Sequence, residues 1–576
     1  MDINYDIVIV GGSLGGCAAA LRAASMGASV CLIETSDWLG GQYTAQGVMT
    51  PDENQYTETV GSTAAYRDFQ HSVRAYYRGN FRLSARGRNQ PSLNPAGGYP
   101  GFGMEPRVGH NILQQALQNV PKVHLRFETI VTGAEMAGDA IAAIFATTNG
   151  ESNRYIAAVY LDATDLGDLL PHCGQEGEDW VVGAESKEQT GEIHAPDAPR
   201  RDWLQPITFP FALERRPAGE NHTIPKPAEY DHFKAVQNYS LIDGYINSMF
   251  VPGHDMWGYR QFIDASNFSD PSFPYDLTVM NCSANDFKEG GTIPTGDPQV
   301  DQQVLARARL ASVGFLYWIQ TECPRDGGHG IGYPELKPRG DLFDTEFGLS
   351  NQPYIRESRR IKALTTIVEQ DILADFNPPP RAKLFHDSCG IGWYGMDVHG
   401  LAAIGMPEMF GATRPFQIPV SALVPRRLTN LLAACKNLGV THLTNGAYRL
   451  HPIEWNTGES AGALAAFCVQ SGKSAKEVVQ SPELLKAYQH ALLQQGIPLF
   501  WWTDVSADDP VFADAHLLGV NGILSGDEHM HFLPNDLLTT QEKVFIEGAV
   551  GRSLDWPSDI LTRRQAAPWL VRELGL

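Results

Sequence analysis

The sequence predicts an α/β fold in which a Rossmann-type domain is interrupted by an inserted unit. Three observations lead to this class. A β-branched apolar run at 5–10 enters a glycine-rich turn and an Ala-rich helix, which is how a dinucleotide-binding fold begins. Buried strands are also predicted at 155–163 and 428–434, on either side of a long stretch rich in Pro, Trp, Tyr and Phe. A small-residue helix is expected at 458–470, where it can pack closely on the sheet.

The first element is a βαβ unit that closes with a strand at 28–34. Its turn offers backbone N–H groups to a pyrophosphate, because glycine permits the tight turn and the close approach of the helix. Glu34 ends the second strand and can accept hydrogen bonds from the ribose of an adenosine. Ser13 stands where a glycine is more usual, and its hydroxyl can bond a phosphate. The residues of the turn are Gly11, Gly12, Ser13, Leu14, Gly15 and Gly16.

A second glycine pair follows the ribose acid and bears on the choice of cofactor. Gly40 and Gly41 lie where a loop meets the far end of an extended dinucleotide. Nicotinamide dehydrogenases have no particular need of glycine there, whereas flavoproteins bring the ribityl chain and ring of the flavin against this backbone. The pair therefore favours FAD over NAD. Thr35 and Gln42, on either side of the pair, are candidate FAD-binding residues, and 51–105 is expected to be an inserted cover.

The chain then alternates between helix and strand before its composition changes. Residues 105–120 have the apolar spacing of a helix, and strands are expected at 124–131 and 140–148 around a turn at Gly138 and Asp139. With the strand at 155–163, these elements complete the first half of the dinucleotide-binding fold.

Three domains are predicted from the changes along the chain. Residues 1–170 and 385–475 form a discontinuous FAD-binding domain, residues 171–384 an inserted mixed α+β substrate domain, and residues 476–576 a small helical C-terminal extension. The helices expected outside the FAD-binding domain are 307–321, 359–372, 482–495 and 540–549.

The composition of the chain excludes some classes of partner and indicates where in the cell the protein is found. The chain has 576 residues and a formal net charge of −22, which disfavours nucleic acid and anionic membrane surfaces as partners. Its eight cysteines are scattered without a C-x-x-C pair, so we expect no metal or iron–sulfur site and no disulfide framework. The first strand begins at residue 5 and no apolar run reaches membrane-spanning length. A soluble, cytoplasmic protein with a small-molecule substrate is therefore expected, in an oligomeric state that the sequence does not predict.

Several motifs together resemble a family of FAD-dependent oxidoreductases that opens with GG-(Ser/Thr)-x-x-G and continues with an LGG loop. They are GGSLGG at 11–16, LGGQ at 39–42, MEPRV at 104–108, DATDLGD at 162–168, PYIRESRRI at 353–361, DSCGIGWYGMDVHG at 387–400 and NLLAACKNLGVTHLTNGAYRLHPIEWNTGESAG at 430–462. The family is related to the flavin subunit of heterodisulfide reductase, whose cysteine clusters this chain lacks. The resemblance therefore implies the flavin without an iron–sulfur electron path.

The resemblance also implies which residues hold the cofactor. NTGESAG is expected to begin the last helix with an Asn/Thr cap. Thr457, Gly458 and Glu459 would then face the ribityl chain or pyrophosphate through the helix N-terminus. The other candidate FAD-binding residues are Val131, Ala163, Thr164, Asp165, Asn437, Asn445 and Gly446.

The predicted chemistry is the oxidation of a small organic substrate. The sequence has no second strand-borne G-x-G-x-x-G for NAD(P)H. The substrate is therefore the expected reductant of the flavin, which oxygen or another acceptor reoxidises. An amine or alcohol would lose hydride at a C–N or C–O bond, with a histidine as the base. The candidate bases rank His399, His451, His442, and a structural histidine is the alternative for each. A flavin monooxygenase or desaturase of a specialised metabolite and a flavin-binding protein without turnover are the alternative functions.

Other residues on these motifs each allow two interpretations. The basic run from Arg356 to Arg360 can clamp a substrate carboxylate, although a solvated helix face is favoured. Trp393 and Tyr394 either wall the substrate pocket or pack in the core. Cys389 is expected to be an inert buried thiol rather than a redox residue.

Overall fold

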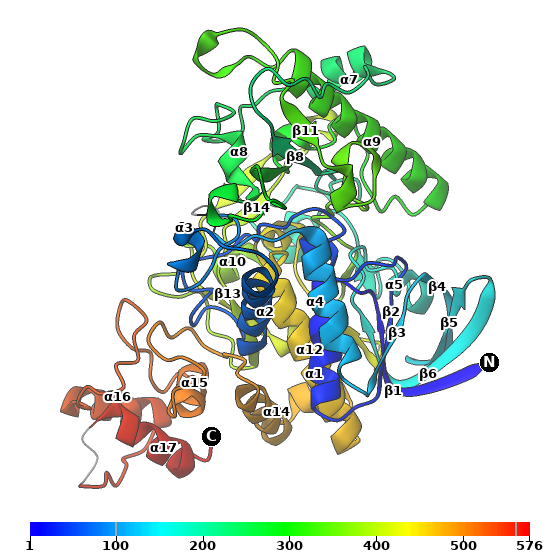
Figure 1. Ribbon diagram of the computed structural model, residues 1–576. Coiled ribbons are helices and arrows are strands. Elements are labelled where there is room, and N and C mark those ends of the chain that lie inside the picture. Colours follow the sequence, from blue (N-terminus) through cyan, green and yellow to red (C-terminus); the bar gives the residue numbers. More distant parts are fainter. Residues whose placement is uncertain (98–100, 559–561) are drawn as a thin grey trace.

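A seven-stranded mixed sheet lies at the right of the protein in Figure 1, with one side parallel and the other antiparallel. The computed structural model describes residues 1–97, 101–558 and 562–576. The strand order is β3-β2-β1-β6-β5-β4, and β17 pairs in parallel with the carboxyl end of β6. This is the α/β, Rossmann-type arrangement that the sequence predicts. The strands are β1 (Asp2–Val10), β2 (Val30–Ile33), β3 (Val123–Arg126), β4 (Thr129–Ala137), β5 (Ala140–Thr148), β6 (Glu151–Asp162) and β17 (Leu431–Ala433).

Two helices from opposite ends of the dinucleotide-binding fold pack against each other. Helix α1 (Leu14–Ser25) lies beside α12 (His451–Ser471), as Figure 1 shows, with α4 (Pro106–Gln118) next to them. A Cβ added at Gly458 would lie 2.0 Å from the Gly15 carbonyl oxygen, and one at Gly462 would lie 2.3 Å from that of Ala19. The small residues of both helices are therefore required by the backbone contact between them.

The start of α12 corrects the sequence prediction. The helix begins at His451, with Pro452 in its first turn, where a missing N–H costs nothing. Gly458 and Glu459 consequently lie in its second and third turns, not at its N-terminus. Glu459 accepts a hydrogen bond from Arg22 Nε at 3.0 Å. Gly458 and Glu459 therefore both contact α1, and the N-terminus of α12 cannot present them to a cofactor.

Two other predicted elements differ from the structure. The strand expected at 124–131 is two strands, because Glu128 takes a left-handed conformation with φ of 49° between β3 and β4. The helix expected at 359–372 is absent: the segment holds the short strand β12 (Arg360–Ile361) and the single turn α10 (Glu369–Ile372). The buried side chain of Arg360 fixes this extended path through ion pairs with Glu185 and Glu357.

A second unit sits above the sheet in Figure 1 and has a hydrophobic core of its own. The buried residues of that core lie between Ile207 and Ile355. They pack an antiparallel sheet of order β11-β8-β10-β9 against the long helix α9. The elements are β8 (Phe211–Arg215), β9 (Gln261–Ile263), β10 (Leu277–Met280), β11 (Leu336–Pro338), α7 (Tyr230–Gln237), α8 (Met256–Tyr259) and α9 (Pro298–Thr321).

The C-terminal helices pack on the main core rather than forming a core of their own. Tyr488 of α14 and Ala566 of α17 belong to the same buried cluster as the central sheet. In the described residues no helix is both long and apolar enough to cross a membrane. The remaining longer elements are α2 (Ala64–Asn80), α11 (His442–Tyr448), α13 (Ala475–Gln480), α14 (Pro482–Gln494), α15 (Phe512–Val520), α16 (Thr540–Val550), α17 (Arg563–Leu574), β13 (Ser388–Gly392), β14 (Met396–Val398), β15 (Met409–Gly411) and β16 (Phe416–Pro419).

The contact between α1 and α12 predicts the effect of one methyl group. Gly458→Ala should lower the free energy of unfolding by about 1–3 kcal/mol, because the new Cβ overlaps the backbone of Gly15. Gly548→Ala is the matched control, since a Cβ on this exposed helical glycine of α16 meets nothing within 4 Å. It should be neutral or stabilising by up to about 1 kcal/mol. Equal unfolding midpoints in urea for the two variants would show that the helices do not meet at Gly458.

Candidate functional site

A groove of about 220 Å³ opens where β1, β2 and β6 end. Ligands of open α/β sheets bind outside the carboxyl ends of the strands. We call this the cofactor groove. Its lining residues are Val10, Gly11, Ile33, Glu34, Thr35, Gln46, Thr129, Thr164, Asp165, Leu166, Asp168, Ile293, Leu305, Gln352, Pro353 and Ile355. Five of the residues predicted from the sequence are among them.

The glycine-rich turn lies against the loop that follows β6. Gly11 has φ of 105°, and a Cβ there would lie 2.4 Å from the backbone carbonyl of Ala163. The first turn of α1 leaves N–H groups without intrahelical partners, as every helix start does. Ser13 uses its hydroxyl to cap that turn, accepting from the Gly16 N–H at 3.1 Å. Since the N–H groups of Gly12, Gly15 and Gly16 donate to side chains of the protein, those of Ser13 and Leu14 are left for an anion. The Ser13 hydroxyl has a structural role as a helix cap.

The LGGQ loop is fastened to the same turn. The Gly40 N–H donates to the Gly12 carbonyl oxygen at 2.8 Å, and Gly40 has φ of 100°. A Cβ on Gly41 would lie 3.1 Å from the Cα of Ser13. The two glycine-rich segments are thus one surface, as an extended dinucleotide requires.

Glu34 lines the groove at the end of β2. Its carboxylate accepts hydrogen bonds from the Gly12 N–H at 2.7 Å and the Ser36 N–H at 2.8 Å. Burial raises the pKa of Glu34 above its usual 4.5, against the hydrogen bonds from Ser36 and Gly12, which lower it. Oε1 also accepts from the hydroxyls of Thr35 and Ser36, whereas Oε2, among the described residues, accepts only from Gly12 and keeps a lone pair for a ribose hydroxyl.

A fully buried lysine joins the segments around the groove. The ammonium of Lys436 forms ion pairs with Asp165 and, at 3.6 Å, with Glu454. Burial lowers its pKa, but the two carboxylates raise it well above the usual range. The Gly15 N–H in turn donates to Glu454 Oε1 at 3.1 Å. Asp165, Cys435 and Glu454 are close enough to share a metal ion, but Lys436 already pairs with both carboxylates, and we assign no metal to them.

Three buried amides next to the groove have one half without a partner. Gln42 Nε2 donates to the Arg449 carbonyl oxygen at 3.0 Å, and Asn445 Nδ2 to that of Arg356 at 2.8 Å. Gln46 Oε1 accepts from the Ile355 N–H at 3.1 Å. Within the described residues, Gln42 Oε1, Asn445 Oδ1 and Gln46 Nε2 have no partner. Buried polar atoms are normally bonded. A flavin ring carries both donors and acceptors along its pyrimidine edge, so these amides fit it.

A second cavity, of about 270 Å³, lies on the other side of a thin wall. We call it the arginine cavity. Along the wall, Pro353 and Ile355 line the groove, whereas Tyr354 and Arg356 line the arginine cavity. Its lining residues are Asp52, Asp243, Gly244, Tyr245, Ile246, Tyr259, Arg260, Asn281, Cys282, Ser283, Tyr354, Arg356, Tyr394, Asp397, His399, Glu408, Phe410 and Arg449.

Each buried arginine of this cavity is paired with a carboxylate. Arg260 lies 2.8 Å from Asp52, and Arg449 lies 3.1 Å from Asp397. Arg356 lies 2.9 Å from Asp286, which lines neither cavity. The prediction that Arg356 and Arg360 lie on a solvated helix face was therefore wrong, because both side chains are buried in ion pairs.

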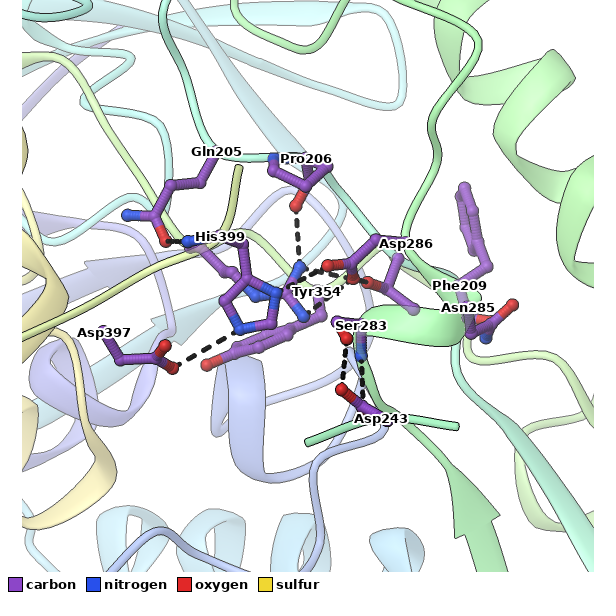
Figure 2. Close-up of polar contacts among 12 residues, drawn as sticks. Gln205, Pro206, Phe209, Asp243, Ser283, Asn285, Asp286, Tyr354, Asp397 and His399 are labelled. Atoms are coloured by element: carbon purple, nitrogen blue, oxygen red, sulfur yellow. Dashed lines mark hydrogen bonds and ion pairs between the residues drawn. The ribbon is translucent and has the colours of Figure 1, made fainter. Parts of the chain in front are cut away.

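His399 lies in the arginine cavity between two carboxylates (Figure 2). Its Nδ1 is 2.6 Å from Asp286 and its Nε2 is 3.4 Å from Asp397. Burial and the charge of Arg356 lower the pKa of His399, but both carboxylates raise it to a net value above the usual 6.5. Burial alone would raise the pKa of Asp286, yet Arg356 and His399 bring it down to about 2. The imidazole is thus oriented by Asp286 with Nε2 toward the cavity.

The other two candidate histidines do not line either cavity. Burial lowers the pKa of His451 to about 3, and its ring nitrogens contact the Val48 carbonyl oxygen and, at 3.4 Å, the Asp52 N–H. The Nδ1 of His442 lies 2.9 Å from Glu357. These contacts favour the structural alternative for both residues, so the ranking reduces to His399.

Several predicted cofactor residues hold the backbone together instead of lining the groove. Asn437 donates to the Asp162 carbonyl oxygen at 3.0 Å. A Cβ on Gly446 would lie 2.6 Å from the backbone of Asp397. Val131 and Thr457 are likewise absent from the lining, as are Gly458 and Glu459.

Sequence reasoning missed other residues of the site. Lys436 and Glu454 were not proposed, although a charged residue inside a run as apolar as LLAAC or among the small residues of α12 is a usable signal. No sequence motif pointed to Gln46 or Ile355.

The two aromatic residues that allowed two interpretations lie in different places. Tyr394 lines the arginine cavity, and Trp393 stacks on Tyr56 outside it.

The environment of the cysteines disfavours thiolate chemistry. All eight are buried and unpaired. Burial raises the pKa of the Cys389 thiol well above its usual 9.0, which keeps the thiolate from forming at neutral pH.

A family model described as FAD dependent oxidoreductase matches residues 6–492. A search of curated proteins found no match. Among solved structures, a geranylgeranyl bacteriochlorophyll reductase-like protein from Thermoplasma acidophilum is similar at 10% identity and a TM-score of 0.30, over 100% of this chain and 99% of that chain. The flavin-dependent brominase Bmp2 has 12% identity and a TM-score of 0.37, over 85% and 84%. An L-proline dehydrogenase from P. horikoshii has 15% identity and a TM-score of 0.17, over 28% and 23%. At these scores none of the three structures bears on the reaction.

The position of Glu34 predicts a loss of FAD affinity on neutralisation. Glu34→Gln keeps a side-chain oxygen for the Gly12 N–H but loses the charge that strengthens a bond to the ribose. The dissociation constant for FAD, titrated into the apoprotein, should rise about 10- to 100-fold, since such a bond is worth about 1.5–3 kcal/mol. Asp37→Asn, an exposed carboxylate in the same loop, should leave the constant unchanged. Unaltered affinity in Glu34→Gln would place the ribose elsewhere.

Proposed function

The chain belongs to the FAD-dependent oxidoreductase family, and from that premise we propose that it oxidises a small alcohol or amine by hydride transfer to FAD. The observation that carries this proposal is the wall at 353–356, which the cofactor groove and the arginine cavity share. A dinucleotide in the groove and a small molecule in the cavity would be neighbours. Hydride transfer needs direct contact between the two, so the flavin ring has to reach the cavity side of the wall.

In this proposal the residues of the cofactor groove bind FAD, and those of the arginine cavity bind the substrate. The glycine turn, Glu34 and the three amides Gln42, Gln46 and Asn445 would hold FAD, which supplies the hydride acceptor when bound. For an alcohol, the carbon loses hydride to the flavin while the hydroxyl loses its proton, so that a C=O bond forms and the two-electron oxidation balances. An amine gives an imine in the same way. Oxygen or another acceptor would then take the electrons.

His399 is the proposed proton acceptor. Its Nδ1 is held by Asp286, and its Nε2 faces the arginine cavity and Asp397. Only the neutral imidazole can accept a proton. Because the pKa of His399 is raised, that form becomes available as the pH rises through a value above 6.5. Asp286 would stabilise the imidazolium that forms.

The alternatives are less well supported by the site. A flavin monooxygenase needs no oriented base of this kind, whereas a desaturase would use one, so His399 counts only against the monooxygenase. A flavin-binding protein without turnover needs neither a base nor a second cavity, so the arginine cavity and the orientation of His399 support an enzyme. The relation to the flavin subunit of heterodisulfide reductase remains a proposal that rests on GGSLGG and LGGQ.

Location and partners are likewise proposed. Eight unpaired cysteines suit the reducing cytoplasm. A net charge of −22 argues against nucleic acid and anionic membrane surfaces as partners and leaves a small molecule as the expected one.

The proposal predicts that a substrate bleaches the flavin in the absence of oxygen. Purified holoenzyme should lose its visible flavin absorbance when mixed anaerobically with a member of a panel of alcohols and amines. The rate should fall on the acid side with an apparent pKa above 6.5, because protonated His399 cannot act as a base. In His399→Gln, reduction should be slower by about 10²–10⁴ and the acid limb should disappear.

The controls separate a catalytic role from a structural one. His399→Gln should retain FAD and its unfolding midpoint, and His71→Gln, on the exposed side of α2, should behave as wild type. A wild-type rate and pH profile in His399→Gln would contradict the base assignment. Failure of every alcohol and amine to bleach the flavin would contradict the proposed reaction.

A further inference from the structure

We infer that the arginine cavity takes an organic ammonium ion, so that the proposed oxidation acts on an amine rather than an alcohol. This inference rests on the proposed function, because it names the class of substrate for the same site. Two features of the cavity carry it: carboxylates that hold no cation, and exposed aromatic side chains close to them in the chain.

One face of the strand pair β14 and β15 lines the cavity. Asp397 of β14 lies directly opposite Phe410 of β15 in the antiparallel pairing. Side chains alternate along an extended chain, so the residues two positions away, His399 and Glu408, lie on the same face. All four residues are in the lining of the cavity. The proposed base therefore has a second carboxylate and an aromatic ring as neighbours.

Glu408 brings to this face a carboxylate that no cation neutralises. It is exposed, and among the described residues it has no ion-pair partner. Asp243, another lining residue, accepts from the Ser283 N–H at 2.9 Å and from the Ser283 hydroxyl, as Figure 2 shows. Both of these donors are uncharged, so the negative charge of Asp243 is available to a ligand.

The cavity therefore has more carboxylates than cations. Each of its three arginines already has a carboxylate of its own, in Asp52, Asp286 and Asp397. Asp243 and Glu408 are left to face a single histidine, and negative charge is in excess even when that histidine is protonated. This excess repels an anion, whereas an ammonium ion balances it without displacing any arginine from its partner.

Each of these two carboxylates has an aromatic ring two residues further along the chain. Phe410 follows Glu408, and Tyr245 follows Asp243. Both rings line the cavity, and both are exposed for such large side chains, Phe410 at 71% and Tyr245 at 51%. The faces of aromatic rings attract ammonium ions. A carboxylate and a ring together are thus the groups that recognise an organic cation, and the cavity has them twice.

His399 is placed to prepare such a cation for oxidation. The neutral imidazole accepts one proton from the ammonium group at Nε2, which faces the cavity. The carbon beside the nitrogen then loses hydride to FAD, and a C=N bond forms. The two electrons of the C–H bond pass to FAD, so the reaction balances. The product is an iminium ion, which keeps the positive charge that the carboxylates bind.

The test measures binding separately from oxidation. Oxidised holoenzyme is examined by equilibrium dialysis with phenyltrimethylammonium, 2-phenylpropan-2-ol and 2-methyl-2-phenylpropanoate. These probes are similar in shape and differ in charge, and none can form a C=N or C=O bond by losing hydride, so none is consumed. The cation should bind most tightly, and its affinity should fall as salt is added.

Two variants locate the bound cation. Glu408→Gln should weaken binding of phenyltrimethylammonium about two- to fivefold and leave binding of the alcohol unchanged. Phe410→Ala should weaken binding of the cation about two- to fivefold. The controls are Glu528→Gln, which removes a carboxylate that is 84% exposed outside the cavity, and Phe545→Ala, an exposed phenylalanine of α16. Neither control should change the affinity.

The outcomes separate this inference from the proposed reaction. Tightest binding of the alcohol or the carboxylate, or no saturable binding of the cation, overturns the inference. Equal affinities for the cation in Glu408→Gln and the wild type would also contradict it. Binding of the cation, with no primary amine able to bleach the flavin anaerobically, upholds the ligand class and counts against oxidation by the flavin. Bleaching by alcohols and by no amine upholds the oxidation and overturns the choice of an amine.

Discussion

The buried ammonium of Lys436 is the interaction on which the rest of the site depends. Removing an ion from water costs several kcal/mol, so it is retained only where partners surround it. Here the partners come from the loop after β6, through Asp165, and from the first turn of α12, through Glu454. Glu454 in turn holds the N–H of Gly15 in the glycine turn. One buried charge therefore fixes the relative positions of the segments that form the cofactor groove.

The same contacts continue from the groove to the arginine cavity. Gln42 bonds both Glu454 and the backbone of Arg449. The side chain of Arg449 pairs with Asp397, whose carboxylate faces His399. The groups of the cofactor groove and those of the arginine cavity thus belong to one polar network, and the wall at 353–356 lies between its two ends. Such buried networks are costly when incomplete. The unpartnered halves of Gln42, Gln46 and Asn445 accordingly mark where a ligand belongs.

Sequence patterns were sufficient where the signal is local. The turn at 11–16, the acid at Glu34 and the parallel strands follow from spacing and composition, and the structure has them. The start of α12 did not follow, because NTGESAG also suits a helix cap and only the contact with α1 shows that Gly458 is a packing residue. The helix predicted at 359–372 was wrong for a related reason. A run of arginines is ordinarily solvated, and of the two partners that bury Arg360, Glu185 is distant in sequence and Glu357 lies at an i, i+3 spacing that also suits a helix.

The central claim is that FAD in the groove and a substrate in the arginine cavity meet at the wall formed by 353–356. A crystal structure of the FAD-bound protein tests it most directly. The account predicts that the adenosine ribose contacts Glu34, that the pyrimidine edge of the flavin bonds Gln42, Gln46 or Asn445, and that one face of the ring is exposed to the arginine cavity. A flavin ring that remained on the groove side of the wall, out of contact with the cavity, would contradict it.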